Sequence, residues 1–178
     1  PWVDRREDGT LQSIYSGARM DADRPRDVDW TAAILRTPLD AQSIAQSVAL
    51  MGAAGPGLNC EHVVPRVWFQ DQQPMRGDLH HLFTCSETDN SLRSSLPLRD
   101  PGQGGYTPAA GRGAAARATL YFLLRYPGKA NEYRRQDVAT LLRWHREDPV
   151  SEYEHHRNQA IFARQGNRNP LIDHPAWA

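Results

Sequence analysis

The chain has 178 residues, of which 39% are hydrophobic and 24% charged, and its 21 basic residues balance its 21 acidic residues. This composition excludes a membrane-spanning protein, because no segment approaches the roughly 18 consecutive apolar residues that a transmembrane helix needs. It also argues against a disordered chain, since aliphatic and aromatic residues recur along most of the sequence. We therefore expect one folded domain over residues 1–178.

An N-terminal arm and two helices are expected in the first third of the chain. The arm, residues 1–28, is polar apart from one short apolar patch, so it should either pack on the domain or be partly loose chain. A short helix is predicted for Trp30–Leu35. A second helix should begin at Thr37, which can cap it, and end at Gly52, because the apolar residues between them recur at helical spacing.

A strand–loop–strand–helix unit is predicted for residues 58–95. Leu58–Val64 should form the first strand and Leu79–Thr84 the second, with a polar loop between them. Thr88 or Asp89 can then cap a short helix. These segments predict a small β–β–α unit between helical regions.

Three helices are predicted for residues 107–166. The first, over 107–126, is apolar on all sides in its second half, so it should lie at the centre of the protein. Apolar spacing from Val138 to His145 indicates the second helix, which Asp148-Pro149 should end, and a capping box opens the third, over 151–166. The tail, residues 167–178, is expected to be a loop. The fold class predicted from these elements is α+β and mainly helical.

Ionisable and amide side chains gather in the β–β–α unit. Carboxylate and amide oxygens suit a hard divalent cation such as Mg²⁺, a neutral imidazole can accept a proton from water, and a guanidinium can contact a phosphate oxygen. Together these groups indicate a phosphodiesterase site. The residues concerned are Glu61, His62, Asp78, His80, His81, Asn90 and Arg93.

Each of these motifs alone more commonly marks a strand end at the surface or a structural histidine, and only their combination favours a site. Neighbouring residues on a strand point to opposite faces. Glu61 and His62 can therefore serve one site only at a strand end or a bulge.

The charge of the chain is unevenly distributed. Residues 91–146 hold 10 basic and 3 acidic residues, a net charge of +7, whereas residues 1–60 hold 6 basic and 8 acidic residues, a net charge of −2. The basic segment could meet a polyanion such as a nucleic acid, although solvated helix faces explain charge runs equally well. Two cysteines, Cys60 and Cys85, could form one disulfide or remain thiols.

The motifs resemble those of the bacterial endonuclease I family, non-specific nucleases of the ββα-metal (His-Me finger) group that are secreted or periplasmic. The segments that carry the likeness cover about two thirds of the chain and are Asn59–Phe69, Met75–Leu82, Asn90–Arg93, Gly111–Arg117 and Gln165–Pro170.

The resemblance implies a role for each site residue. Glu61 and Asn90 would hold one Mg²⁺, with Mn²⁺ or Ca²⁺ as substitutes, and His62 would be the general base that activates water. Arg93 would stabilise the charge that develops on the phosphate. Three residues would orient the base or brace the strands, namely Asp78, His80 and His81. Five arginines are candidates for contacts with nucleic acid: Arg66, Arg99, Arg112, Arg117 and Arg168.

The expected function is therefore that of a secreted or periplasmic, monomeric endonuclease that cuts DNA without sequence preference and leaves 5′-phosphate ends, with RNA as a further substrate left open. Two departures from the family pattern, at Val67 and Ser94, keep a second reading open, in which the unit binds nucleic acid without cutting it. A third reading is a phosphodiesterase restricted to RNA. A disulfide between Cys60 and Cys85 would suit a secreted enzyme.

Overall fold

The computed structural model describes residues 3–22, 57–130 and 137–178. The two helices expected at Trp30–Leu35 and from Thr37 to Gly52 lie outside them.

The centre of the β–β–α unit is an antiparallel pair of strands, β3 (Leu58–His62) and β4 (Leu82–Ser86). Glu61 lies opposite Phe83 in their register. Helix α3 (Glu87–Arg93) follows β4 directly. The predicted order of strand, strand and helix is therefore confirmed.

The boundaries of this unit differ from those predicted. Leu79–His81 forms a 3-10 turn, η3, because the Asp78 side chain accepts a hydrogen bond from the His80 N–H, so the second strand begins three residues later than expected. Ser86 caps α3 in place of Thr88 or Asp89, since its hydroxyl accepts the N–H of Asp89.

The described part of the N-terminal arm forms a hairpin of β1 (Thr10–Gln12) and β2 (Arg19–Asp21). The connection between its strands runs beside β4, where the Ile14 N–H donates to the Thr84 carbonyl over 3.0 Å. Tyr15 is fully buried there. The arm thus packs on the β–β–α unit, as its apolar patch indicated.

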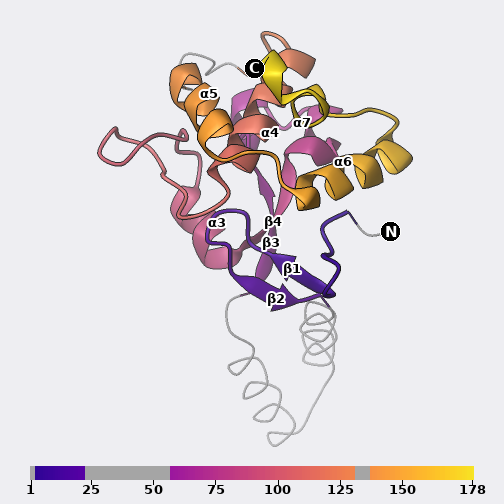
Figure 1. The fold of residues 1–178 in the computed structure, drawn as a ribbon. Coiled ribbons are helices and arrows are strands. Elements are labelled where there is room, and N and C mark those ends of the chain that lie inside the picture. Colours follow the sequence, from indigo (N-terminus) through magenta and orange to yellow (C-terminus); the bar gives the residue numbers. More distant parts are fainter. Residues whose placement is uncertain (1–2, 23–56, 131–136) are drawn as a thin grey trace, which may run out of the picture.

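The helical part of the protein is built around α4 (Arg112–Arg125), which packs against α5 (Val138–Glu147), α7 (Pro170–Asp173) and η3. Figure 1 shows α4 among the other helices, with β3 and β4 beside it and α6 (Glu152–Gln165) on the outside. The central position predicted for this helix is confirmed.

Helix α4 begins five residues later than predicted. Gly111, at its N-cap, has a φ of 61°, and a Cβ there would lie 2.3 Å from the Ile14 carbonyl oxygen, so only glycine fits. The capping box of α6 at Ser151 and Glu154 is present as expected. The tail is not entirely a loop, because Asn169 caps the short helix α7.

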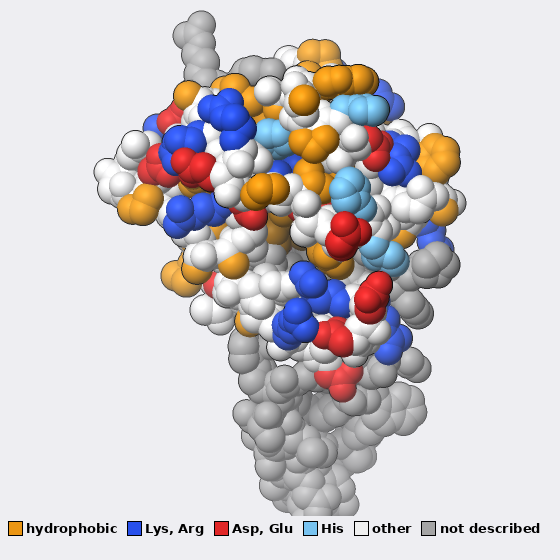
Figure 2. Space-filling model, viewed as in Figure 1, with side chains coloured by type: hydrophobic (Ala, Val, Ile, Leu, Met, Phe, Trp, Pro, Cys, Tyr) orange, Lys and Arg blue, Asp and Glu red, His pale blue; other side chains and the backbone are white. Residues whose placement is uncertain are grey.

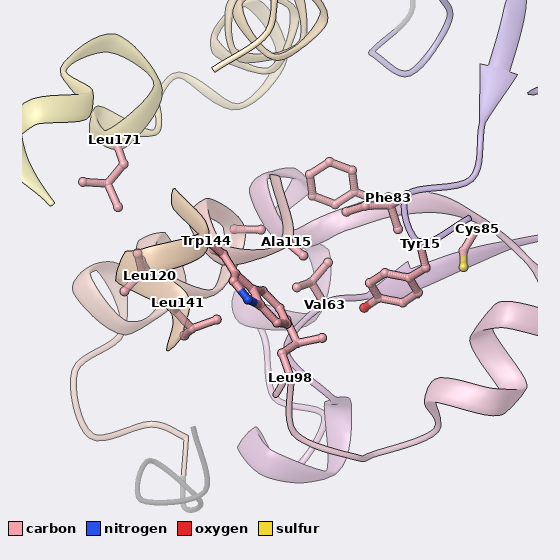
Figure 3. Close-up of a cluster of buried hydrophobic side chains, with 13 residues drawn as sticks. Tyr15, Val63, Phe83, Cys85, Leu98, Ala115, Leu120, Leu141, Trp144 and Leu171 are labelled. Atoms are coloured by element: carbon pink, nitrogen blue, oxygen red, sulfur yellow. The ribbon is translucent and has the colours of Figure 1, made fainter. Parts of the chain in front are cut away.

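A buried apolar cluster joins the arm, the strands and the helices. Figure 3 shows Tyr15 beside Val63 and Cys85 in this cluster, with Trp144 of α5 at its centre. The α+β class is confirmed by this mixture of small sheets and packed helices. No helix among the described residues has both the length and the apolarity needed to cross a bilayer.

The two cysteines are free thiols, Cys60 exposed and Cys85 buried. Cys85 lies opposite Asn59 in the strand register, whereas Cys60 lies opposite Thr84. Because facing residues share a side of the sheet and neighbours alternate, the two thiols point to opposite faces. The disulfide that the sequence left open is therefore not formed in this structure.

Candidate active site

Glu61 is a buried carboxylate, 4% exposed, near the end of β3. The Tyr15 hydroxyl donates a 2.7 Å hydrogen bond to its Oε1 atom, and the Arg93 Nε lies 3.6 Å from the same oxygen. Burial raises the pKa of Glu61 above its usual value, and the positive charge of Arg93 and the Tyr15 hydrogen bond oppose this rise. The site therefore holds one carboxylate between a phenol and a guanidinium.

Arg93 lies in the interior, with an exposed fraction of 0%. Its Nη2 donates to the Val63 carbonyl over 2.6 Å and its Nη1 to the Ser94 carbonyl over 3.0 Å. These contacts fix the guanidinium beside Glu61. The predicted contact between Arg93 and a phosphate disagrees with this geometry. The guanidinium is buried and donates two hydrogen bonds to backbone carbonyls, so it could reach a phosphate only by breaking them.

Asn90 lies on α3, one turn before Arg93, and is half-buried. Residues three apart on a helix share a face. Asn90 and Arg93 therefore lie on one face of α3, and Arg93 meets Glu61 from this helix.

The oxygen atoms of Glu61 and Asn90 are suitable ligands for a hard cation. The described residues contain no group of three or more His, Cys, Asp or Glu side chains arranged to hold a metal. One carboxylate and one amide would leave most coordination positions to water and to phosphate oxygens, which is the usual mode of Mg²⁺ binding. A softer metal that needs several imidazole or thiolate ligands does not suit this set.

His62, the last residue of β3, is half-buried and points away from the Glu61 side of the strand. Its Nε2 lies 3.0 Å from the Arg76 carbonyl. A carbonyl only accepts, so Nε2 carries the hydrogen and Nδ1 of the neutral ring keeps its lone pair. Burial lowers the pKa of His62 below its usual value, and the bond to Arg76 partly offsets this.

His81 is a second imidazole held in the same way. Its Nε2 lies 2.6 Å from the Met75 carbonyl, and its ring packs edge-on against that of His62 with 5.5 Å between centroids. Burial lowers the pKa of His81 to about 4. Consecutive carbonyls of η2 (Met75–Gly77) thus hold His81 and His62 side by side.

Asp78, which lies between η2 and η3 in the sequence, accepts several hydrogen bonds. Its Oδ2 accepts from the hydroxyls of Tyr121 and Tyr126, over 2.8 and 2.7 Å, and its Oδ1 accepts from Gln165 over 2.8 Å. Burial opposes ionisation, but these hydrogen bonds outweigh it and lower the pKa of Asp78. The segment that holds His62 is in this way fixed to α4 and α6.

His80 faces this network and not the site. Its Nε2 lies 3.1 Å from the Asn167 carbonyl, and its ring packs on Tyr121. Burial lowers the pKa of His80, which favours the neutral ring.

The five arginines predicted to contact nucleic acid lie in different environments. Arg117 is buried, and it donates to both carboxylate oxygens of Glu154, over 2.7 and 2.9 Å. This corrects its assignment, since these bonds leave no donor surface for a phosphate. Arg168 pairs with Asp173, and Arg112 donates to the Pro108 carbonyl. Arg99 is half-buried. Arg66 is exposed.

Two residues near the site were missed by sequence reasoning. Tyr15 contacts Glu61 from a segment 46 residues away, and no local pattern could indicate this. Arg76 belongs to the segment Met75–Leu82, and its own carbonyl holds His62. The side chains of Arg66 and Arg76 are each 52% exposed and lie within 4 Å of Asp71.

The charged surface is mixed in sign. On the face in Figure 2, Lys and Arg side chains occur in several patches with Asp and Glu between them, not in one basic stripe.

Comparison with known proteins gives several extracellular nucleases. The chain is 33% identical over 132 residues to an extracellular ribonuclease of Bacillus subtilis (strain 168), with 57% of this chain and 45% of that protein covered. It is 32% identical over 130 residues to an extracellular ribonuclease of Bacillus amyloliquefaciens, with the same coverage. It is 34% identical over 118 residues to an extracellular deoxyribonuclease of Aeromonas hydrophila, with 56% and 50% covered.

The chain spans about half the length of these curated relatives. The family model for endonuclease I matches far more of it, over residues 6–111 and 107–176. This match includes the β1–β2 hairpin, strands β3 and β4, and helices α3 to α7. The chain therefore belongs to the endonuclease I family.

Proposed function

We propose that the protein is a secreted, metal-dependent endonuclease that hydrolyses phosphodiester bonds in nucleic acids without sequence preference and leaves 5′-phosphate ends. The observation that carries this proposal is the β–β–α unit, in which β3 supplies Glu61 and a neutral imidazole, His62, and α3 supplies Asn90. Membership of the endonuclease I family supports it.

His62 is the general base in this proposal. The Arg76 carbonyl fixes the hydrogen on Nε2, so Nδ1 is free of a proton and can accept one from a water molecule that attacks phosphorus. The depressed pKa of His62 keeps the ring in this neutral form at physiological pH. Asp78 and His81 hold the segment from which the Arg76 carbonyl projects.

Glu61 and Asn90 would hold the divalent cation, which when bound offsets charge on the phosphate and on the leaving oxygen. Arg93 keeps the Glu61 carboxylate in place through its buried position 3.6 Å away. We assign contact with the phosphate to Arg66 and Arg76 instead, because both are exposed and both lie close enough to His62 to influence its pKa. Contacts of this kind bind the backbone and carry no sequence preference.

The names of the relatives support secretion and leave the sugar open, since two are called ribonucleases and one a deoxyribonuclease. We propose that the chain acts on DNA and, because its contacts address phosphates, also on RNA. Free thiols do not argue against an extracellular location, because the fold described here needs no disulfide to bury its core.

The test is cleavage of supercoiled plasmid and of a structured RNA with Mg²⁺ and with EDTA. His62→Ala is compared with His155→Ala, which removes an exposed imidazole of α6. We expect cleavage that EDTA abolishes, a rate about 100- to 10,000-fold lower for His62→Ala, and an unchanged rate for His155→Ala. Binding of DNA without cleavage in Mg²⁺, Mn²⁺ or Ca²⁺ would support the non-catalytic reading instead.

A further inference from the structure

Tyr15 is bound more closely to the candidate site than its place in the sequence suggests. Its hydroxyl donates to Glu61 Oε1 over 2.7 Å, and both residues are buried, with exposed fractions of 0% and 4%. The two residues are 46 positions apart. A buried hydrogen bond to a carboxylate is strong and directional, so it constrains the orientation of Glu61.

The Tyr15 ring is itself fixed on several sides. The backbone carbonyl of Tyr15 accepts the Ala110 N–H over 2.8 Å. The Tyr15 ring packs edge-on against the ring of Tyr106, with 5.1 Å between centroids. The preceding residue, Ile14, bonds to β4. In Figure 3 the ring lies within the buried cluster beside Val63 and Cys85. The hydroxyl is therefore presented to Glu61 from a rigid position.

The same segment also reaches the helix that carries Asn90. The Ser13 hydroxyl donates to Asp89 Oδ2 over 2.9 Å and accepts the Ser86 N–H over 3.2 Å. Asp89 directly precedes Asn90, and Ser86 caps α3. One short stretch of the arm thus contacts both elements that supply the predicted ligands.

The geometry points to a positioning role: we propose that Tyr15 orients Glu61 for a divalent cation and that Ser13–Tyr15 completes the cation site. Tyr15 and Arg93 both approach Oε1, so we assign the cation to Oε2. Residues that hydrogen-bond to a metal-ligating side chain and orient it commonly change metal affinity by about 10- to 100-fold when they are mutated. This inference rests on the function proposed above.

The test measures Mn²⁺ binding to the protein in the absence of nucleic acid, from the electron paramagnetic resonance signal of free Mn²⁺. Tyr15→Phe keeps the ring in the core and removes only the hydroxyl. Its control is Tyr153→Phe, which removes a phenol hydrogen bond to Asp4 but does not touch Glu61. We expect the Mn²⁺ Kd to rise about 10-fold for Tyr15→Phe and to stay unchanged for Tyr153→Phe.

Thermal unfolding in EDTA shows whether each variant folds. If Tyr15→Phe does not fold, Ser13→Ala carries the test, because it loosens the segment while the Tyr15 ring stays in place; we then expect a smaller rise in the Mn²⁺ Kd. A wild-type Kd in the folded variant used would overturn the positioning role and leave the proposed function intact. If the wild-type protein itself binds no Mn²⁺, both the cation site and the role of Tyr15 are wrong.

Discussion

Adjacent residues of β3 reach different surroundings, and this difference sets their chemistry. Glu61 turns inward to Tyr15 and Arg93, whereas His62 turns toward the carbonyls of η2. One side chain is suited to hold a cation and the other to accept a proton. His62 is the last residue of β3, and the proposed function places both side chains on one phosphate at this end of the strand.

The pH dependence of cleavage follows from His62. Burial lowers its pKa, so the ring stays neutral at a lower pH than an ordinary imidazole with a pKa near 6.5. Activity is present above the pKa of the folded protein and is lost as the pH falls through it. We expect the acidic limb of kcat/KM to have its midpoint below pH 6.5. A midpoint above 7 would contradict the assigned base.

The exposed arginines give a separate prediction about substrate binding. Arg76→Ala removes a cation beside His62, while Arg164→Ala removes an exposed arginine of α6. Each phosphate contact contributes about 1 to the slope of log K against log salt concentration. We expect Arg76→Ala to reduce this slope by about 1, measured by fluorescence anisotropy of labelled DNA in EDTA. Equal slopes for the wild type and Arg76→Ala would remove Arg76 from the interface.

At the scale of elements, a buried ion pair links α4 to α6. Arg117 donates to both oxygens of Glu154, which also closes the capping box of α6. Removal of one partner leaves a buried charge unpaired, so Glu154→Gln should lower the free energy of unfolding by about 3–5 kcal/mol.

The control for this prediction is Glu147→Gln, which breaks an exposed pair with Arg143 on α5. Its effect should stay below about 1 kcal/mol, because exposed pairs are screened by water. Urea unfolding of both variants measures the difference. Two equally small losses would mean that the buried pair contributes no more to stability than the exposed one.

Local patterns predicted the elements better than their limits. The capping box of α6 and the β–β–α order were read correctly, because both depend on residues close in sequence. The late start of β4 and of α4 was not predicted, since it depends on a cap from Asp78 and on the approach of Ile14 to Gly111. Such contacts arise only when distant segments pack together.

At the scale of the whole molecule, the prediction of the site was likewise incomplete, because it depends on contacts between distant segments. Residue types and spacing identified Glu61, His62 and Asn90 as candidates. They could not show that Arg93 is buried or that Tyr15 contacts Glu61, because burial and contacts over 46 residues are properties of the fold. Arg117 was misassigned for the same reason, because the sequence does not show whether an arginine on a helix is buried or exposed.

Stability of the whole protein should depend on pH through His81. Burial lowers its pKa to about 4, so between pH 4 and 6.5 the unfolded chain binds a proton that the folded protein does not. The stability that neutral His81 contributes to the folded protein is therefore present above pH 6.5 and is lost as the pH falls toward 4. We expect it to lower the free energy of unfolding by about 2 kcal/mol between pH 7 and pH 5.

Urea unfolding at the two pH values checks this prediction. His81→Asn should show a smaller loss of stability between pH 7 and pH 5 than the wild type, whereas His155→Asn, at an exposed position of α6, should lose as much as the wild type. The same pH dependence in His81→Asn and the wild type would place the titrating group elsewhere.

The central claim is that Glu61 and Asn90, from β3 and α3, hold one cation next to His62. Anomalous diffraction from a crystal soaked in Mn²⁺ tests it most directly. We expect a single peak within coordination distance, about 2.0–2.3 Å, of a Glu61 carboxylate oxygen and the Asn90 amide oxygen. A peak bound elsewhere, or no peak with the Asn90 amide turned away from Glu61, would contradict it.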